Sequence, residues 1–243
     1  GNFIWAVRIG GTGSELAYAI KNDASGNLYV TGEFTGTVDF DPGAGSFPLT
    51  SGGSTDVFVL KLDTDGNFIW AKGVGSTGVD RPNSLSLDPS GQIYTTGVFA
   101  ATVDFDPGTG ISNLIAAGAF ESFVLKLDAD GNFVWAVKLG ANTATHDLTT
   151  DAGNVYVTGD FSGTADFDPA GTTFNMTVDG AQDIFVTKLT NAGNFVWARK
   201  MGGTDTETGE TIAVDASGNV YTSGGYMGTA DFDPGAGTFN YTA

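Results

Sequence analysis

Hydrophobic and polar residues alternate with a period of two along most of the chain, as in VFVLKL at 57–62 and FVLKL at 123–127. These segments are rich in Val, Ile, Thr, Phe and Tyr, the residues that favour strands. No segment keeps a helical period between helix caps. The pattern therefore predicts an all-β protein with almost no helix.

The alternating pattern is itself repeated. The words GNFIW and GNFVW begin at residues 1, 66, 131 and 193, and they contain all four tryptophans. A second word, DFDP, begins at residues 39, 104, 166 and 231. Such self-similarity is the signature of a repeat architecture. It predicts a single array of four units, 1–65, 66–130, 131–192 and 193–243, the last of which is truncated.

Each unit divides into four predicted strands. Short Asp/Asn-Gly turns, such as DASGN at 23–27 and DTDGN at 63–67, join the first strand to the second and the third to the fourth. Long, variable loops make the other connections. Because the connections of an antiparallel meander alternate between its ends, the turns share one edge and the loops share the other. This predicts a β-propeller built from four-stranded antiparallel blades of 62–65 residues, incomplete or part of a longer array; a β-solenoid is the alternative.

Two words carry a resemblance to a known family. AVDASGNVYTSG at 213–224 and FVLKLDADGNFVW at 123–135, the latter nearly repeated at 58–70, resemble the bacterial SBBP family of β-propeller repeats. The resemblance covers essentially the whole chain. It implies a secreted or cell-surface propeller that is usually one module of a longer protein. The DFDP loop and the small number of units depart from the family pattern.

The net charge of the chain limits the classes of partner that it can be expected to bind. Ten basic and 28 acidic residues give a net charge of −18, which repels nucleic acid and anionic lipid and attracts divalent cations and basic partners. The chain has no cysteine, and therefore no disulfide or thiolate metal site. It has no run of 18 apolar residues. Neither nucleic-acid binding nor membrane insertion is expected.

The DFDP words are the main candidate metal sites. Residues i and i+2 of a strand face the same side, so their carboxylates repel each other, and Ca²⁺ would cancel that repulsion. The favoured interpretation is a turn, in which Pro keeps the preceding Asp extended and Asp oxygens accept backbone N–H groups. A turn is likewise favoured over a calcium loop for DTDGN and DADGN. The candidate ligands are Asp39, Asp41, Asp104, Asp106, Asp166, Asp168, Asp231 and Asp233.

Variable loop residues are candidates for a ligand-binding face that would take a glycan or a protein: Glu15, Asp80, Arg81, Asp205 and Glu207. The only histidine, His146, has no partner set in the sequence for a zinc site or a catalytic triad, so no catalytic residue is predicted. The sequons at Asn175 and Asn240 would be glycosylation sites in a secreted chain, and chance occurrence is the alternative.

The repeated aromatic residues, including Trp5, Trp70, Trp135 and Trp197, are expected to form the core. So are the periodic tyrosines Tyr29, Tyr94, Tyr156 and Tyr221. The chain is therefore expected to be a non-enzymatic extracellular or cell-surface scaffold for adhesion or surface assembly. Its partners would be further copies of itself or further repeats of a longer chain. The alternative is a glycan- or protein-binding module that uses the variable loops.

Overall fold

The computed structural model describes residues 1–243, which form strands joined by turns and loops. The chain has no helical segment of the length and hydrophobicity that a membrane span requires. The first sheet consists of β2 (Glu15–Asn22), β3 (Leu28–Phe34), β6 (Asp56–Leu62) and β7 (Phe68–Val74). The second consists of β8 (Arg81–Leu87), β9 (Ile93–Phe99), β12 (Glu121–Leu127) and β13 (Phe133–Ala141). The third consists of β14 (Thr143–Thr150), β15 (Asn154–Phe161), β18 (Asp183–Thr190) and β19 (Phe195–Gly203), and β20 (Thr208–Val214) and β21 (Val220–Gly225) form a fourth pair.

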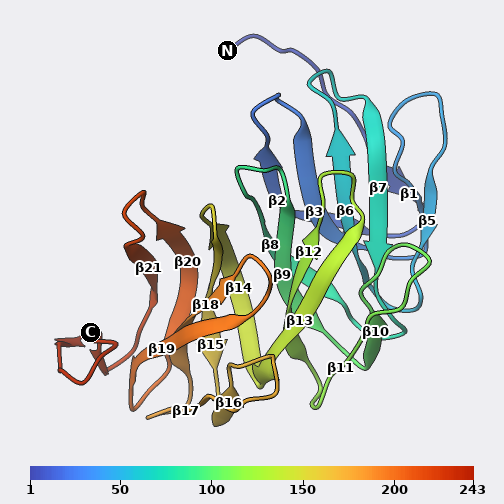
Figure 1. Cartoon of the computed structure of the whole chain (residues 1–243). Coiled ribbons are helices and arrows are strands. Elements are labelled where there is room, and N and C mark those ends of the chain that lie inside the picture. Colours follow the sequence, from blue (N-terminus) through green and yellow to red (C-terminus); the bar gives the residue numbers. More distant parts are fainter.

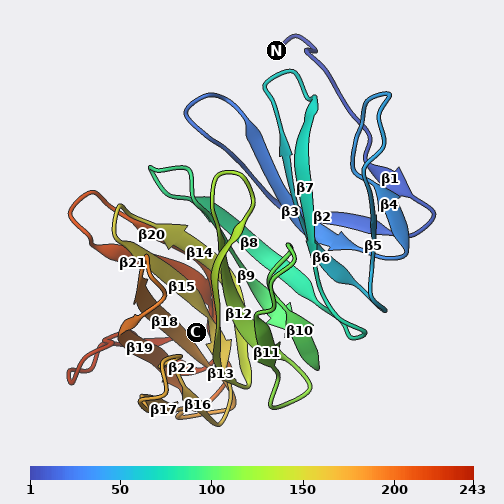
Figure 2. The same cartoon turned by 45° about the vertical axis from the view of Figure 1, so that its right-hand side comes forward.

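Neighbouring sheets pack against each other through their first strands. Strand β2 lies beside β8, β8 beside β14, and β14 beside β20. The sheets therefore follow one another along an arc, with the first sheet at one end and β20–β21 at the other (Figures 1 and 2). The antiparallel four-strand units and the all-β composition confirm the predicted fold class.

The segment after each second strand differs from the prediction. Strand β3 ends at Phe34, and Gly36, with φ of 65°, turns the chain into a separate short hairpin of β4 (Thr37–Asp39) and β5 (Pro48–Thr50). The alternating stretch NLYVTGEFTGTVDF at 27–40, which the pattern predicts as a single strand, is therefore divided between β3 and β4. The equivalent hairpins are β10 (Thr102–Asp104) with β11 (Asn113–Ile115), β16 (Thr164–Asp166) with β17 (Asn175–Thr177), and β22 (Thr229–Asp231) with β23 (Asn240–Thr242).

These hairpins connect the units to one another. Strand β22 pairs with β19, the last strand of the preceding sheet, and β4 pairs in the same way with β1 (Gly10–Gly11). Gly75, just after β7, forms a bridge to Asp104 of the next unit. The DFDP hairpin β22–β23 thus extends the edge of the sheet before it, and β10 is joined to the segment after β7 by a single bridge.

The tight turns have the predicted geometry. The Oδ1 atom of Asp63 accepts the N–H groups of Asp65 and Asn67 at 2.9 and 2.8 Å, and Gly66 has φ of 81°. In the third copy, TNAGN, the hydroxyl oxygen of Thr190 accepts the two equivalent N–H groups. The turn therefore requires an oxygen acceptor and not a charge. For this reason the copy TNAGN can do without the two aspartates of DTDGN.

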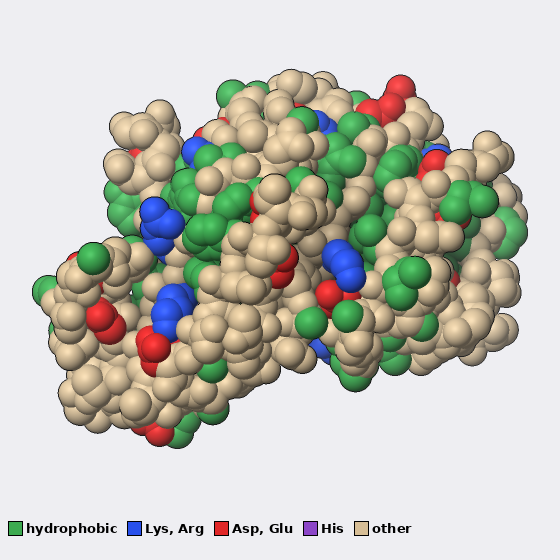
Figure 3. All heavy atoms as spheres, turned by 60° about the horizontal axis from the view of Figure 1, so that its bottom comes forward, with side chains coloured by type: hydrophobic (Ala, Val, Ile, Leu, Met, Phe, Trp, Pro, Cys, Tyr) green, Lys and Arg blue, Asp and Glu red, His purple; other side chains and the backbone are tan.

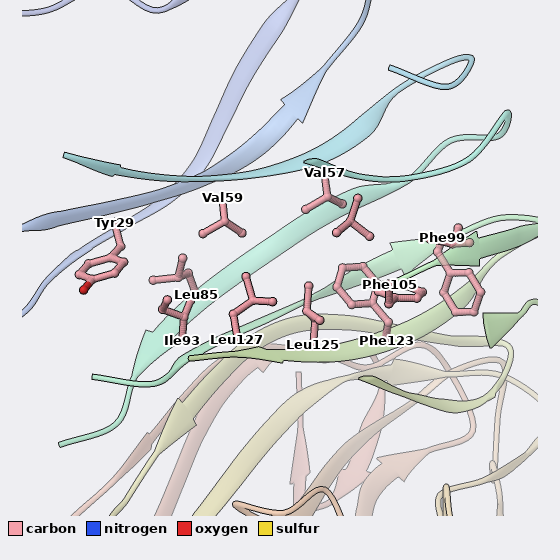
Figure 4. Packing of buried hydrophobic residues seen from close by; sticks show 12 residues of the cluster. Tyr29, Val57, Val59, Leu85, Ile93, Phe99, Phe105, Phe123, Leu125 and Leu127 are labelled. Carbon is pink, nitrogen blue, oxygen red and sulfur yellow. The ribbon is translucent and has the colours of Figure 1, made fainter. Parts of the chain in front are cut away.

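The core lies between adjacent sheets. Figure 4 shows Tyr29, Val57 and Val59 of the first sheet pointing toward side chains of the second, among them Leu85 and Leu125. Within the second unit, Phe99, Phe105 and Phe123 pack edge-on or tilted, with ring centroids 5.0 to 6.4 Å apart. The third unit repeats this triad with Phe161, Phe167 and Phe185, and the first with Phe34, Phe40 and Phe58.

Three of the four tryptophans lie over the glycine that begins the GNF word of the next unit. The indole of Trp5 covers Gly66, Trp70 covers Gly131, and Trp135 covers Gly193, so closely that a Cβ would meet the ring at 3.1–3.2 Å. The indole N–H of Trp135 donates to the backbone oxygen of Asn191 in the same turn at 3.1 Å. Glycine and tryptophan therefore recur in one word because each unit supplies a ring to one neighbour and receives a ring from the other.

The prediction that all periodic aromatic residues are core is confirmed only in part, because the four tryptophans are half-buried and the tyrosines differ between units. Tyr29, Tyr94 and Tyr156 are each 1% exposed. The equivalent Tyr221, in β21, is 59% exposed, and Phe3, in the first GNF word, is 81% exposed. Burial of these rings depends on a neighbouring sheet strand, which the two end segments lack.

Candidate functional site

The loop edge of the array holds two series of carboxylates at equivalent positions. One series begins the third strand of each sheet, and the other lies at or just before the first strand. Each accepts the N–H of the residue four positions earlier, as Asp56 does from Gly52 at 2.9 Å and Asp80 does from Ser76 at 2.6 Å. The first series is Asp56, Glu121 and Asp183, and the second is Glu15, Asp80 and Glu207.

Short parallel bridges bring carboxylates of the two series together. Pairing of Thr55 with Val79 places Asp56 beside Asp80, and an equivalent bridge between Gln182 and Thr206 joins the segments that carry Asp183 and Glu207. Asp56 is 6% exposed, Asp80 1%, and both Asp183 and Glu207 0%. One carboxylate oxygen in each of Asp56, Asp183 and Glu207 has no hydrogen-bond partner. Two pairs of carboxylates, three of them incompletely hydrogen-bonded, are therefore buried between adjacent units.

Burial changes the acidity of these groups. It raises the pKa of Asp56 to about 6, and the charge of Asp80 adds to the effect while the Gly52 N–H opposes it. Burial also raises the pKa of Asp80, Asp183 and Glu207. The ionised form of each is less stable in the folded chain than in the unfolded chain.

Asp56→Asn is expected to raise the free energy of unfolding at pH 7 by about 2 kcal/mol, because it removes a buried charge whose pKa is raised by about two units. A raised carboxyl pKa costs stability as pH rises from the ordinary value of 3.8 to about 6, and the cost disappears below that window. Urea unfolding of both proteins measures this. The gain is expected to shrink near pH 4; an equal gain at both pH values would contradict the burial argument.

The predicted ligand-binding residues do not form one exposed face. Asp80 and Glu207 are buried and hydrogen-bonded to backbone, so the prediction of ligand-facing side chains is wrong for these two. Glu15 is half-buried and accepts the N–H of Gly11 at 3.2 Å. Arg81 and Asp205 are exposed.

A second polar cluster lies on the first two strands of the third sheet. The Nε2 atom of His146 is 2.7 Å from Asp160 Oδ1, and Gln182 Nε2 donates to Asp160 Oδ2 at 3.0 Å. Glu210, on the neighbouring β20, lies 4.0 Å from His146 Nδ1. The hydrogen bond with Asp160 raises the pKa of His146. His146 occupies the position of Tyr18, Asn83 and Glu210 in the other units, so this position varies from unit to unit.

Asp160 is a candidate site residue that the repeat pattern does not mark. It stands at the place that Glu33 holds in the first unit, and Glu33 in turn raises the pKa of Tyr18, although burial of Tyr18 is the larger cause. The signal available in the sequence was that the positions of residues 146 and 160 both vary between units within otherwise repeated segments. Seeing it requires the strand register, which is not part of the word pattern.

The DFDP carboxylates accept backbone N–H groups, as the turn interpretation predicts. Asp39 Oδ1 accepts N–H groups from Asp41 at 3.1 Å and Phe47 at 2.7 Å, and Asp41 Oδ1 accepts the N–H of Gly43 at 2.7 Å. The hydrogen bond from Phe47 is the main cause that lowers the pKa of Asp39. The other three copies repeat these bonds. The structure holds no group of three or more His, Cys, Asp or Glu residues placed to hold a metal ion.

Chelation of divalent cations is expected to leave the melting temperature unchanged, whereas Asp39→Ala lowers it because two backbone N–H groups lose their acceptor. Asp39→Asn is the matched control, because it keeps an oxygen acceptor at the same place. Differential scanning calorimetry measures all three. A fall on chelation that is abolished by Asp41→Asn and its three equivalents would support the calcium alternative.

The two sequons lie on equivalent exposed strands. Asn175 begins β17 and pairs with Asp166, and Asn240 begins β23 and pairs with Asp231. Both asparagines are exposed. Their side chains are thus accessible, and their modification stays a prediction.

Charged side chains are sparse on the surface. Figure 3 shows few Lys and Arg side chains on one face, separated by uncharged surface and by hydrophobic side chains. Over the whole chain, acidic residues outnumber basic residues by 28 to 10. A cationic partner is therefore favoured over an anionic one.

Together, the repeated four-stranded sheets define an all-β repeat protein with propeller-like blades. No family model matches the chain, so the SBBP resemblance stays a prediction. The chain is 25% identical over 283 residues to an uncharacterized WD repeat-containing protein of Acanthamoeba polyphaga mimivirus, a match that covers 93% of this chain and 20% of that protein. It is 24% identical over 228 residues to the regulatory protein FlaEY of Caulobacter vibrioides, with 89% and 23% covered.

The chain is thus distantly homologous to both proteins, and it spans about a fifth of their length. The likeness to a WD repeat-containing protein supports the interpretation of the sheets as propeller-like blades.

Proposed function

We propose that the chain is a non-enzymatic scaffold of β-propeller repeats that acts outside the cell or at the cell surface, in adhesion or surface assembly. One observation carries the proposal: the repeated residues build contacts between units. Trp70 covers the glycine of the next unit, and the DFDP hairpin that begins with β22 extends the preceding sheet. A sequence whose most repeated words make inter-unit contacts is suited to extension of the array.

The partner that we propose is a further repeat, either another copy of the chain or a continuation of the same array. Strand β21 pairs only with β20, so its other edge presents unpaired backbone groups. Beside this edge, a cavity of about 450 Å³ is lined by Val186, Trp197 and Tyr221. An unpaired strand edge beside apolar side chains is a template for strand addition.

Sedimentation velocity tests self-association of the purified chain. Species heavier than 25.0 kDa are expected to increase with concentration. Tyr221→Lys places a charge beside the β21 edge and is expected to weaken the association. Ile111→Lys, at a residue that is 79% exposed in another unit, is the control and leaves it unchanged. A single 25.0 kDa species at every concentration would contradict self-assembly.

A second candidate function is a glycan- or protein-binding module. The observation that favours it is the variation at the position of Tyr18, Asn83, His146 and Glu210, where each unit presents a different polar side chain on an inner strand. Exposed Arg81 and Asp205 are the loop residues that remain candidates for this role.

A glycan array distinguishes the two functions. Selective binding that is lost in Arg81→Ala or His146→Ala, but kept in the turn variant Asp65→Asn, would favour the binding module. Asp65 is suited as the control because its side chain makes no hydrogen bond in the turn, whereas its backbone N–H donates to Asp63. Absence of any selective glycan would leave the scaffold as the better account.

A further inference from the structure

In the second and third sheets, a lysine of the fourth strand lies next to the buried carboxylate that begins the third strand. Lys138 Nζ is 3.1 Å from Glu121 Oε2, and Lys200 Nζ is 3.4 Å from Asp183 Oδ2. The two lysines have the same register, Lys138 opposite Phe123 and Lys200 opposite Phe185. The ion pair therefore follows from the repeat and is built into each of these two sheets.

The first sheet keeps the carboxylate and lacks the lysine. Asp56 is 6% exposed, and its Oδ2 atom, the counterpart of the oxygens that the two lysines approach, accepts only the N–H of Gly52. Its Oδ1 atom has no hydrogen-bond partner, as is also true of Asp183 Oδ1. Opposite Phe58, in the register of the two lysines, stands Gly73. The adjacent Lys72 does not replace them, because its side chain lies against Gly131 and its charge acts on Asp128.

A cavity of about 410 Å³ lies beside Asp56 and Gly73. Thr50 also lines this cavity. Its equivalent in the second unit is Ile115, and the carbonyl oxygen of Ile115 accepts a hydrogen bond from Lys138 Nζ at 2.9 Å. A Cβ atom at position 73 would lie 3.5 Å from Leu49 and 3.7 Å from Phe34, which are ordinary contacts. The cavity thus combines a buried carboxylate, the counterpart of a carbonyl that binds ammonium, and the apolar side chains of Leu49 and Phe34.

We propose that this cavity binds a primary alkylammonium group, with the ammonium on Asp56 and the alkyl chain against Leu49 and Phe34. The ammonium group of such a ligand corresponds to Nζ of Lys138 and Lys200, and its alkyl chain corresponds to the methylene groups of these lysines. The net charge of −18 favours the approach of a cation. The proposal does not rest on the scaffold function, since it concerns one position in one sheet.

An inorganic cation fits the cavity less well. Ca²⁺ takes six to eight oxygen ligands. Besides Asp56, the only carboxylate that lines the cavity is Asp104, and its Oδ1 atom already accepts N–H groups from Asp106 and Ser112. Phe34, Leu49 and Val74 supply an apolar part of the wall, which suits an alkyl stem.

The test is a titration of the purified chain with n-butylammonium chloride at neutral pH, followed by the carboxyl-carbon NMR signal of Asp56. A saturable shift is expected, and tetramethylammonium at the same ionic strength, which has no N–H donor, should not reproduce it. Binding is expected to weaken as pH falls below about 6, where Asp56 takes up a proton. The other charged groups in this region are Asp80, whose charge acts on Asp56, and Asp104 and Lys72, which line the cavity; the side chain of Lys72 lies against Gly131.

Gly73→Lys is the decisive variant, because it installs the lysine that the other sheets have. It is expected to lower the pKa of Asp56 and to abolish butylammonium binding, while the folded state is kept because a Cβ at this position makes only ordinary contacts. Asp56→Asn should also abolish binding. Comparable binding to Gly73→Lys and to the unchanged chain would overturn the proposal, as would a response to Na⁺ or Ca²⁺ without one to butylammonium.

Two further probes separate the sources of the ammonium group. Stronger binding of Nα-acetyl-lysine methylamide would indicate a lysine side chain of a partner protein. Stronger binding of butane-1,4-diamine would indicate a free amine. Either result supports the site, and failure of both together with butylammonium would overturn it.

Discussion

Phe123→Ala is expected to lower the free energy of unfolding by about 3–5 kcal/mol, the largest effect of any single substitution considered for this chain. Phe123 is 0% exposed and lies in the cluster between the first and second sheets. Its ring packs against Phe105 at 5.0 Å and Phe99 at 6.4 Å between centroids. Removing it leaves a cavity that strands fixed on both sides cannot close.

Chemical denaturation of Phe123→Ala and Phe120→Ala measures this effect. Phe120 precedes the same strand and is 47% exposed, so its truncation is expected to change the stability by less than about 1 kcal/mol. The two substitutions remove the same atoms and differ in burial. Similar losses for both would show that the stability does not come from packing between the sheets.

Gly97→Ala is expected to cost about 3 kcal/mol or more, because a Cβ would overlap the carbonyl oxygen of Arg81. Gly97 lies opposite a bulge in β8, where the register shifts between Pro82 and Ser84. The bulge pushes the neighbouring backbone toward the glycine. The same contact recurs at the other glycines of the VTG, TTG and TSG words: Gly32, Gly159 and Gly224.

Gly73→Ala is the matched control for Gly97→Ala. Both glycines lie within strands, and a Cβ at Gly73 would meet only Leu49 and Phe34 side chains at 3.5 Å or more. The control is expected to be neutral or slightly stabilising, since alanine restricts the unfolded chain. Thermal unfolding of both variants measures the difference. A loss of equal size in both would indicate a general cost of replacing glycine in these strands.

The repeat words predicted most of the fold because their physical causes are local. Alternation of apolar and polar residues sets which face of a strand is buried, and the turn at Asp63 is closed by bonds within five residues. The predicted hairpin turns and four-strand units are present. The separate hairpin at Thr37–Asp39 was not predicted, because the break at Gly36 leaves the alternating pattern almost continuous.

The candidate sites were predicted less well. The DFDP acids were correctly placed at the end of a strand, since Pro and Gly mark that position. Asp80 and Glu207 were expected to face a ligand, and they are buried, because loop residues in a repeat array can lie between two units. The His146–Asp160 contact joins residues of two paired strands, and only the register across them brings the two side chains together.

By itself, the sequence determined the length of the unit, the strands and turns within it, and the residues that recur in every unit. These follow from side-chain alternation and from the conformations of Gly, Asn, Asp and Pro. Only the tertiary structure decided which carboxylates are buried and which of them have a cation. Asp56, Glu121 and Asp183 look equivalent in the sequence, but their environments differ because the residue that faces each comes from another strand. Gly73 faces Asp56, whereas Lys138 and Lys200 face the other two, and packing between units excludes the water that would otherwise make this difference small.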